Sequence, residues 1–290
     1  MTELLFNTFS TSLPEKLFMD RITQTAVNCV PPDRRTLLKV ACRAVFTAGD
    51  CIKKLYHQPH EITMKGAIDL VTEADLAAEK AILASLEEDC PGLPFMTEES
   101  SATHGNHPGD CFWIIDPLDG TTNFAHGFPF FAVSIAYFAH GTPHVGVVYA
   151  PMFDELFCAV KDCGAWLNGS AIEVTKTGQL IESLIGTGFP YDLEGNTAKV
   201  MRQFESVLTN VRVIRRAGAA ALDLAYLACG RLDGLYEIDL QPWDTAAGCL
   251  LVEEAGGKVT DFSGGTYSPF LSEILASNPM LHPHLLRLLR

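Results

Sequence analysis

The sequence predicts a mixed α and β fold in two halves, in which an α+β half precedes an alternating α/β half. Apolar residues recur at helical spacing between Leu37 and Leu55, which predicts a long amphipathic helix. Successive β-prone runs separated by turns follow between residues 130 and 167 and predict an antiparallel sheet. Beyond Thr175 short strands and helices alternate, which is the pattern of an α/β layout.

The first half begins with a segment that is expected to stand apart from the core. Residues 1–33 end in Val-Pro-Pro-Asp and show a broken helical pattern, which predicts a peripheral arm. After the long helix, a second helix is expected to start just after Thr72 or Asp75 and to run to about Leu86. A strand over 111–115 should give way to a loop at Asp-Pro-Leu-Asp-Gly-Thr-Thr. Further strands are expected over 94–97, 130–138, 144–149, 155–160 and 165–167.

The second half is expected to alternate without a break into separate domains. Strands are predicted over 184–188, 211–214, 234–238 and 258–261, and helices over 196–208, 219–229 and 245–255. No repeat, low-complexity segment or linker occurs, so residues 34–174 and 175–290 are expected to be two subdomains of a single structural unit.

Composition restricts the classes of function. The chain has 290 residues, 48% of them hydrophobic, which is enough to bury a large core. A formal charge of -14 disfavours direct nucleic-acid binding, because the protein would repel a phosphate backbone. Nine cysteines without a Cys-x-x-Cys pair, and a first twenty residues without a secretory pattern, predict a cytoplasmic protein with reduced thiols. The longest apolar stretch, 128–138, is too short to cross a membrane.

The central motif is Trp-Ile-Ile-Asp-Pro-Leu-Asp-Gly-Thr-Thr-Asn-Phe, over residues 113–124. Asp116 and Asp119 lie on either side of a proline bend, where both carboxylates and the Leu118 carbonyl can face one hard cation such as Mg²⁺. The following Gly120-Thr121-Thr122 should open a helix, whose free amides favour an anion such as phosphate. Taken alone, the motif is equally compatible with a polar turn in which an aspartate caps a helix.

Three other acidic motifs occur at expected ends of helices or strands. Asp75 closes the run Asp-Leu-Val-Thr-Glu-Ala-Asp at a helix start, where capping is the favoured interpretation in isolation. Glu98 begins a Glu-Glu-Ser run after an expected strand, and a solvated loop acid is the favoured interpretation of that run alone. Asp244 follows a tryptophan at the start of an apolar helix and is also compatible with a helix cap.

Together the four motifs resemble the inositol monophosphatase family, from Lys65 to Asp261. The resemblance implies a layered sandwich of alternating α-β-α-β-α layers, like that of inositol monophosphatases and fructose bisphosphatases, commonly assembled as a homodimer. The first subdomain would carry the metal and phosphate site, and the second would complete it. Two to three Mg²⁺ ions would bind per site, and lithium would inhibit by competing for one position.

The resemblance also implies a role for individual residues. Glu98, Asp116 and the Leu118 carbonyl would bind the first metal, and Asp116, Asp119 and Asp244 the second. Thr121, paired with Asp75, would orient and deprotonate the attacking water, with Glu98 also assisting catalysis. The residues expected to bind substrate are Lys65, Asp119, Gly120, Thr121, Thr122, Ala220 and Glu237, the last two at the sugar alcohol, although Glu237 is also compatible with a surface strand acid.

These expectations predict Mg²⁺-dependent hydrolysis of a phosphate monoester by metal-activated water, with myo-inositol monophosphate as the favoured substrate. Alternatives are a related sugar phosphatase acting on fructose 1,6-bisphosphate or histidinol phosphate, or a regulatory partner-binding protein on the same fold. Thr97 and Ala219 depart from the family pattern and bear on substrate preference. His104 and His107 favour a solvated loop over a zinc site, and Arg215-Arg216 favours a surface or subunit contact over a phosphate clamp.

Overall fold

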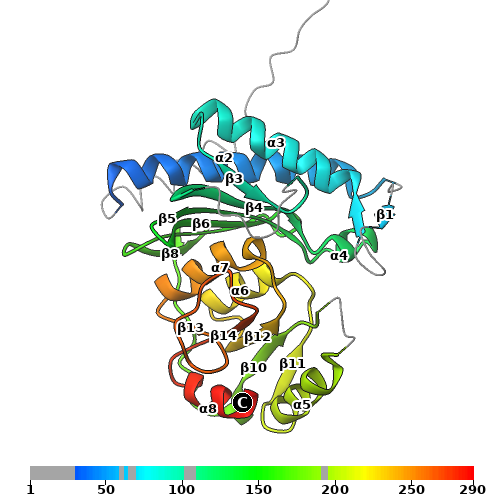
Figure 1. Ribbon diagram of the computed structural model, residues 1–290, viewed down its shortest axis with the longest axis vertical. Coiled ribbons are helices and arrows are strands. Elements are labelled where there is room, and N and C mark those ends of the chain that lie inside the picture. Colours follow the sequence, from blue (N-terminus) through cyan, green and yellow to red (C-terminus); the bar gives the residue numbers. More distant parts are fainter. Residues whose placement is uncertain (1–29, 59–61, 65–69, 101–108, 191–194) are drawn as a thin grey trace, which may run out of the picture.

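The computed structural model describes residues 30–58, 62–64, 70–100, 109–190 and 195–290. Lys65, His104, His107 and most of the expected arm lie outside these described residues. Helices and sheets alternate in five layers along the long axis of the molecule (Figure 1). No helix in the described ranges is long and apolar enough to cross a membrane.

The first layer consists of two helices, α2 (Pro32–Leu55) and α3 (Glu73–Asp89). The predicted helices over these regions are confirmed, although α2 begins within the last residues of the expected arm. Pro32 stands in the first turn of α2, where a missing backbone N–H costs no hydrogen bond. A two-stranded ribbon, β1 (Ile62–Met64) and β2 (Leu70–Thr72), leads into α3.

The second layer is a seven-stranded sheet, antiparallel except for the parallel pair β3–β4. Its strands, in spatial order, are β3 (Phe95–Thr97), β4 (Cys111–Asp119), β5 (Ala132–Ala139), β6 (Thr142–Ala150), β7 (Glu155–Val160), β8 (Gly164–Leu167) and β9 (Ser170–Ala171). Alternate side chains of β4 enter different cores, because successive residues of a strand face opposite sides. Trp113 and Ile115 pack with α2 and α3, whereas Phe112 and Ile114 pack with the helices of the third layer.

The third layer consists of α6 (Ala220–Ala228) and α7 (Pro242–Glu254), buried between the two sheets (Figure 1). The fourth is a five-stranded sheet in the order β11 (Val213–Arg215), β10 (Leu184–Thr187), β12 (Gly234–Ile238), β14 (Glu273–Ser277) and β13 (Lys258–Thr260). A short 3₁₀ helix, Leu180–Glu182, precedes β10. Helices α5 (Thr197–Leu208) and α8 (His282–Leu289) form the fifth layer, so the predicted α-β-α-β-α sandwich is confirmed.

Three details differ from the sequence predictions. The strand expected to end at Ile115 continues to Asp119, because β4 resumes its pairing with β5 after an irregularity. Helix α7 begins at Pro242 rather than Thr245, which places Asp244 inside its first turn. Strand β14 and helix α8 lie beyond the last predicted element, and β14 fills the position between β12 and β13 in the sheet.

Candidate active site

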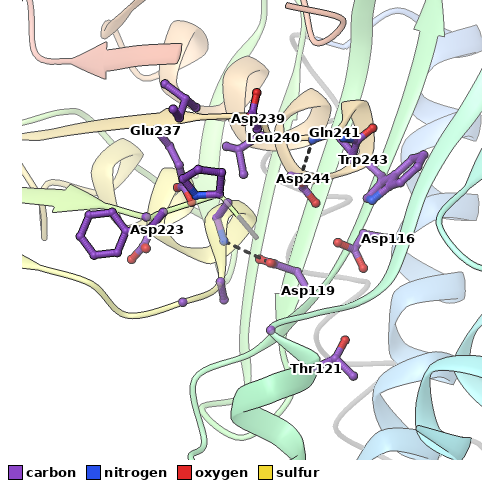
Figure 2. Close-up of a pocket in the computed structure, with 18 of the residues that line it drawn as sticks. Asp116, Asp119, Thr121, Asp223, Glu237, Asp239, Leu240, Gln241, Trp243 and Asp244 are labelled. Atoms are coloured by element: carbon purple, nitrogen blue, oxygen red, sulfur yellow. Dashed lines mark hydrogen bonds between the residues drawn. The ribbon is translucent and has the colours of Figure 1, made fainter. Parts of the chain in front are cut away.

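The two central aspartates face the same side of the first sheet because β4 contains a bulge. Asp116 pairs with Ser134 of β5, and Asp119 pairs with Ala132, so three steps on β4 oppose two steps on β5. Residues three apart on a regular strand face opposite sides, and one extra residue restores them to the same side. Both carboxylates therefore face the third layer, toward α6 and α7 (Figure 2).

Asp116 lies at the centre of the acidic site and is 1% exposed. One carboxylate oxygen, Oδ1, accepts a hydrogen bond from the Leu118 N–H at 3.0 Å, which closes a turn around Pro117. Burial raises the pKa of Asp116 well above its usual value, and the charges of Glu98, Asp119 and Asp244 raise it further. Four carboxylates from three separate parts of the chain therefore lie close enough to affect one another.

Asp119 joins the first sheet to the start of α6. Its carboxylate accepts hydrogen bonds from the backbone N–H groups of Ala220 (3.1 Å), Ala221 (2.8 Å) and Leu222 (3.3 Å). These donors would otherwise lack a partner at a helix start, and they lower the pKa of the carboxyl group. Burial is the stronger effect, so the pKa of Asp119 rises to about 7.

Asp75 both caps α3 and holds Thr121. Its Oδ2 accepts hydrogen bonds from the Thr72 N–H at 2.8 Å and the Thr72 hydroxyl at 2.6 Å, the arrangement of a capping box. Its Oδ1 accepts a hydrogen bond from the Thr121 hydroxyl at 2.8 Å. The Thr121 oxygen also lies 3.0 Å from the Leu118 carbonyl oxygen. The capping interpretation is correct for Asp75, and the same carboxylate forms the expected pair with Thr121.

Thr121 begins the predicted helix after the motif, α4 (Thr121–Ala125), which is only five residues long. Gly120 precedes it with a φ of 93°, a left-handed conformation that favours glycine. Thr122 is exposed and does not line the cavity described below, unlike Gly120 and Thr121. The side chain of Thr122 therefore does not support its predicted role in phosphate binding.

Asp244 occupies the third position of α7 and accepts a hydrogen bond from the Gln241 N–H at 2.7 Å (Figure 2). This bond satisfies a donor at the helix start, so the capping interpretation is correct for Asp244 as well. Its carboxylate also lines the cavity and acts on Asp116. The helix start and the acidic site therefore share the same side chain.

These groups open into one cavity of about 450 Å³ between the two halves of the chain (Figure 2). At one end lie Asp116, Asp119, Thr121 and Asp244, and at the other lie Asp223 and Glu237 (Figure 2). Other residues that line the cavity include Glu98, Thr187, Gly188, Phe189, Arg216, Ala220, Asp239 and Leu240.

Glu237 enters the cavity because residue 188 is a glycine. A Cβ on Gly188 would lie 1.6 Å from Oε1 of Glu237, so any side chain there would displace the carboxylate. Burial raises the pKa of Glu237 well above its usual value, Asp223 raises it further, and Arg216 lowers it. Glu237 is therefore a cavity residue, and the alternative of a surface strand acid is wrong.

Arg216 and Asp223 are cavity residues for which no individual role was predicted, although Asp223 ends the run from Gly218 that the family resemblance places at the sugar alcohol. Of the described residues lining the cavity, Arg216 alone carries a positive charge, so its interpretation as a surface or subunit contact is incomplete. Asp223 is 3% exposed, and burial raises its pKa well above the usual value. The available signal was the Gly-Ala-rich stretch that follows Arg216 and leads into α6, whose first turn contains Asp223.

The donor set fits a hard divalent cation. Carboxylates and the Leu118 carbonyl supply only oxygen, which Mg²⁺ prefers, and no histidine or cysteine is among the described lining residues. Within the described ranges, no three acidic, histidine or cysteine side chains already stand in a compact metal-binding cluster. Asp119 and Asp244 accept backbone hydrogen bonds, so ion binding would have to compete with these contacts.

Solved structures with the same architecture define the class of protein. The SuhB protein of Bartonella henselae superposes with a TM-score of 0.83 at 41% identity, covering 88% of this chain and 98% of that one. The inositol monophosphatase of Anabaena superposes with a TM-score of 0.80 at 38% identity, covering 89% and 96%. The fold is thus that of the inositol monophosphatase type of phosphatase.

Sequence comparison gives the family. The model of the inositol monophosphatase family matches residues 33–290, and the chain belongs to this family. The Escherichia coli protein named Nus factor SuhB is 44% identical over 245 residues, which cover 84% of this chain and 91% of that protein. An inositol-1-monophosphatase of Synechocystis is 43% identical over 256 residues, covering 88% and 89%. Members of the family are phosphatases and generally depend on Mg²⁺.

Proposed function

We propose that this chain hydrolyses myo-inositol monophosphate to inositol and phosphate in a Mg²⁺-dependent reaction. The observation that carries the proposal is the Asp75–Thr121 hydrogen bond of 2.8 Å beside a cavity whose wall holds Glu98, Asp116 and Asp119. A hydroxyl whose proton points to a carboxylate presents its oxygen lone pairs elsewhere, so it can accept a proton from a water molecule. The pair is therefore suited to orient the attacking water and to relay its proton to Asp75.

The acids supply the metal sites, as assigned from the family resemblance. Glu98, Asp116 and the Leu118 carbonyl would hold the first ion, and Asp116, Asp119 and Asp244 the second. Bound Mg²⁺ would neutralise the charge of the phosphate and lower the pKa of a water molecule. Without such ions, ionised carboxylates would repel a phosphate, because both are negatively charged.

The second end of the cavity supports recognition of a polyhydroxylated alcohol. Glu237 and Asp223 are hydrogen-bond acceptors suited to sugar hydroxyl groups, and Arg216 beside them limits their mutual repulsion. The Ala220 backbone lies in the same wall, between the alcohol end and Asp119. Lys65 and Gly120 complete the proposed substrate contacts, Lys65 from the family resemblance alone.

The direct test is release of inorganic phosphate by the purified chain, with and without Mg²⁺. Myo-inositol monophosphate, fructose 1,6-bisphosphate and histidinol phosphate should be compared, and we expect the highest kcat/KM with the first. Asp116→Asn should abolish turnover while the fold is kept, and Asp110→Asn is a matched control at an exposed aspartate. Lithium should inhibit at high Mg²⁺. Turnover by a well-folded Asp116→Asn variant would contradict the assignment.

Assembly and location complete the proposal. From the family resemblance we propose a homodimer, and from the cysteine pattern a cytoplasmic protein. The eight described cysteines are free thiols, in accord with that pattern. Sedimentation of the purified chain tests the dimer.

A regulatory, partner-binding role is the second candidate, because the 44% identical relatives of Escherichia coli and Salmonella typhimurium carry the name Nus factor SuhB. Absence of any Mg²⁺-dependent phosphate release from the folded chain would favour it over hydrolysis.

A further inference from the structure

A buried glutamate of α3 holds the segment that contains Glu98. Glu79 is 6% exposed, and its Oε2 accepts hydrogen bonds from the Thr97 hydroxyl at 2.5 Å and from the Glu99 N–H at 3.1 Å. Its Oε1 accepts a hydrogen bond from the Ser100 hydroxyl. Three donors from the residues around Glu98 thus converge on one carboxylate.

The contact suits a carboxylate. A carboxylate offers two acceptor oxygens and no donor, and hydrogen bonds to an ionised acceptor are stronger than those between neutral groups. An amide at the same place would offer one acceptor oxygen and an NH₂ group, which can donate to the Ser100 hydroxyl oxygen. Glutamine therefore keeps the shape of Glu79 but loses the carboxylate and the stronger hydrogen bonds that a carboxylate accepts.

The same segment is attached to β4 on its other side. The Glu98 N–H donates to the carbonyl oxygen of Ile115 at 3.3 Å, and Ile115 directly precedes Asp116. The backbone of Glu98 is thus tied both to the strand that carries Asp116 and, through its neighbours, to Glu79. The contact places the Glu98 side chain in the cavity wall with Asp116.

Asp75 and Glu79 lie four residues apart on α3, so they share one face of the helix. Asp75 holds Thr121, and Glu79 holds residues 97–100. One helix face therefore supports two separate parts of the site.

We propose that Glu79 is a positioning residue for metal binding, which fixes residues 97–100 so that the Glu98 carboxylate faces Asp116. The inference rests on the proposed function, because it takes Glu98 as a metal ligand. Residues that orient a metal ligand commonly change metal affinity by about 10- to 100-fold when they are replaced. Loss of the Glu79 carboxylate should therefore weaken Mg²⁺ binding while the reacting groups remain intact.

The test is a Glu79→Gln variant, with Glu88→Gln as the matched control at an exposed position of the same helix. Mg²⁺ binding to the EDTA-treated chains is measured by calorimetry, and the Mg²⁺ dependence of phosphate release is measured separately. We expect Glu79→Gln to bind Mg²⁺ about 10- to 100-fold more weakly and to recover kcat near the wild-type value at saturating Mg²⁺. Glu88→Gln should match the wild type in both measurements.

The outcomes separate this inference from the proposed function. A Glu79→Gln variant with wild-type Mg²⁺ affinity overturns the inference, and so does one whose lost kcat excess Mg²⁺ does not restore. If the wild-type chain itself neither binds Mg²⁺ nor releases phosphate, the proposed function fails instead.

Variants on the segment side keep the inference testable if Glu79→Gln does not fold. Ser100→Ala and Thr97→Val each remove one donor to Glu79, and Ser100 is exposed. Each should raise the half-saturating Mg²⁺ concentration several-fold, and unchanged Mg²⁺ affinity in both would overturn the inference.

Discussion

Replacement of Asp119 by asparagine should remove a pH-dependent loss of stability from the ion-free chain and abolish its activity at the same time. The pKa of this 7% exposed carboxyl rises from 3.8 to about 7, chiefly through burial. A group with a raised folded-state pKa supports folding fully below the unfolded value, and this support is lost as the pH rises through the folded value. The ion-free chain should therefore lose stability between about pH 4 and pH 7.

The size of this effect follows from the same shift. About three pH units at roughly 1.4 kcal/mol each correspond to about 4 kcal/mol of unfolding free energy lost above pH 7. Asparagine has no charge to bury, but its NH₂ group cannot accept a backbone hydrogen bond from α6, which costs about 1–3 kcal/mol at every pH. The stability of Asp119→Asn relative to the wild type should thus rise by up to about 4 kcal/mol from pH 4 to pH 8 in EDTA.

Urea unfolding of both chains in EDTA at pH 4, 6 and 8 gives the required free energies. Added Mg²⁺ should stabilise the wild type strongly and the variant weakly, because a ligand stabilises only a state that binds it. Asp110→Asn, at an exposed position, serves as the control. Identical pH dependence of the wild type and Asp119→Asn would refute the reasoning.

Three further outcomes are expected. Gly188→Ala should displace Glu237 and lower kcat/KM for inositol monophosphate about 10- to 100-fold with Mg²⁺ affinity retained, because the substrate loses a hydrogen bond and leaves a buried group unpaired. An unchanged kcat/KM would show that Glu237 does not contribute to substrate recognition. In steady-state kinetics, Thr121→Val should lower kcat about 10²- to 10⁴-fold, and Thr121→Ser should lower it much less, because serine keeps the hydroxyl group. Similar kcat values for the two variants would show that the hydroxyl does not take part in catalysis. Burial lowers the pKa of His282 from 6.5 to about 4, so this side chain binds a proton less readily in the folded chain than in the unfolded chain. The free energy of unfolding should therefore fall by about 3 kcal/mol from pH 6.5 to pH 4. His282→Gln should reduce that fall in urea titrations, and an unchanged slope would assign it to other groups.

Local patterns predicted most elements because each pattern has a local physical cause. The helical spacing of apolar residues fixed the identity of α2, and turn residues delimited β5 to β8. Strand β14 could not be recognised in the same way. It is five residues long and depends on partners on both sides, β12 and β13, which lie earlier in the chain.

In the candidate site, too, features with a local sequence pattern could be predicted, and features that depend on distant parts of the chain could not. The acids around Asp116 could be found from their motifs, because each stands at the end of a strand or the start of a helix. The bulge that turns Asp116 and Asp119 to one face depends on the register with β5, which no local pattern reveals. Arg216 enters the cavity through the packing of the second half against the first, and its local sequence indicates only a basic pair.

The cavity has two ends that belong to different sheets, and this has a consequence for how such proteins diverge. The groups proposed to break the phosphate ester lie on β4 and on helix starts. Gly188 directly follows β10, and Glu237 belongs to β12. Substitutions confined to the second sheet can therefore alter which alcohol is accepted and leave the phosphate chemistry as it was. We expect relatives with different substrates to differ mainly there.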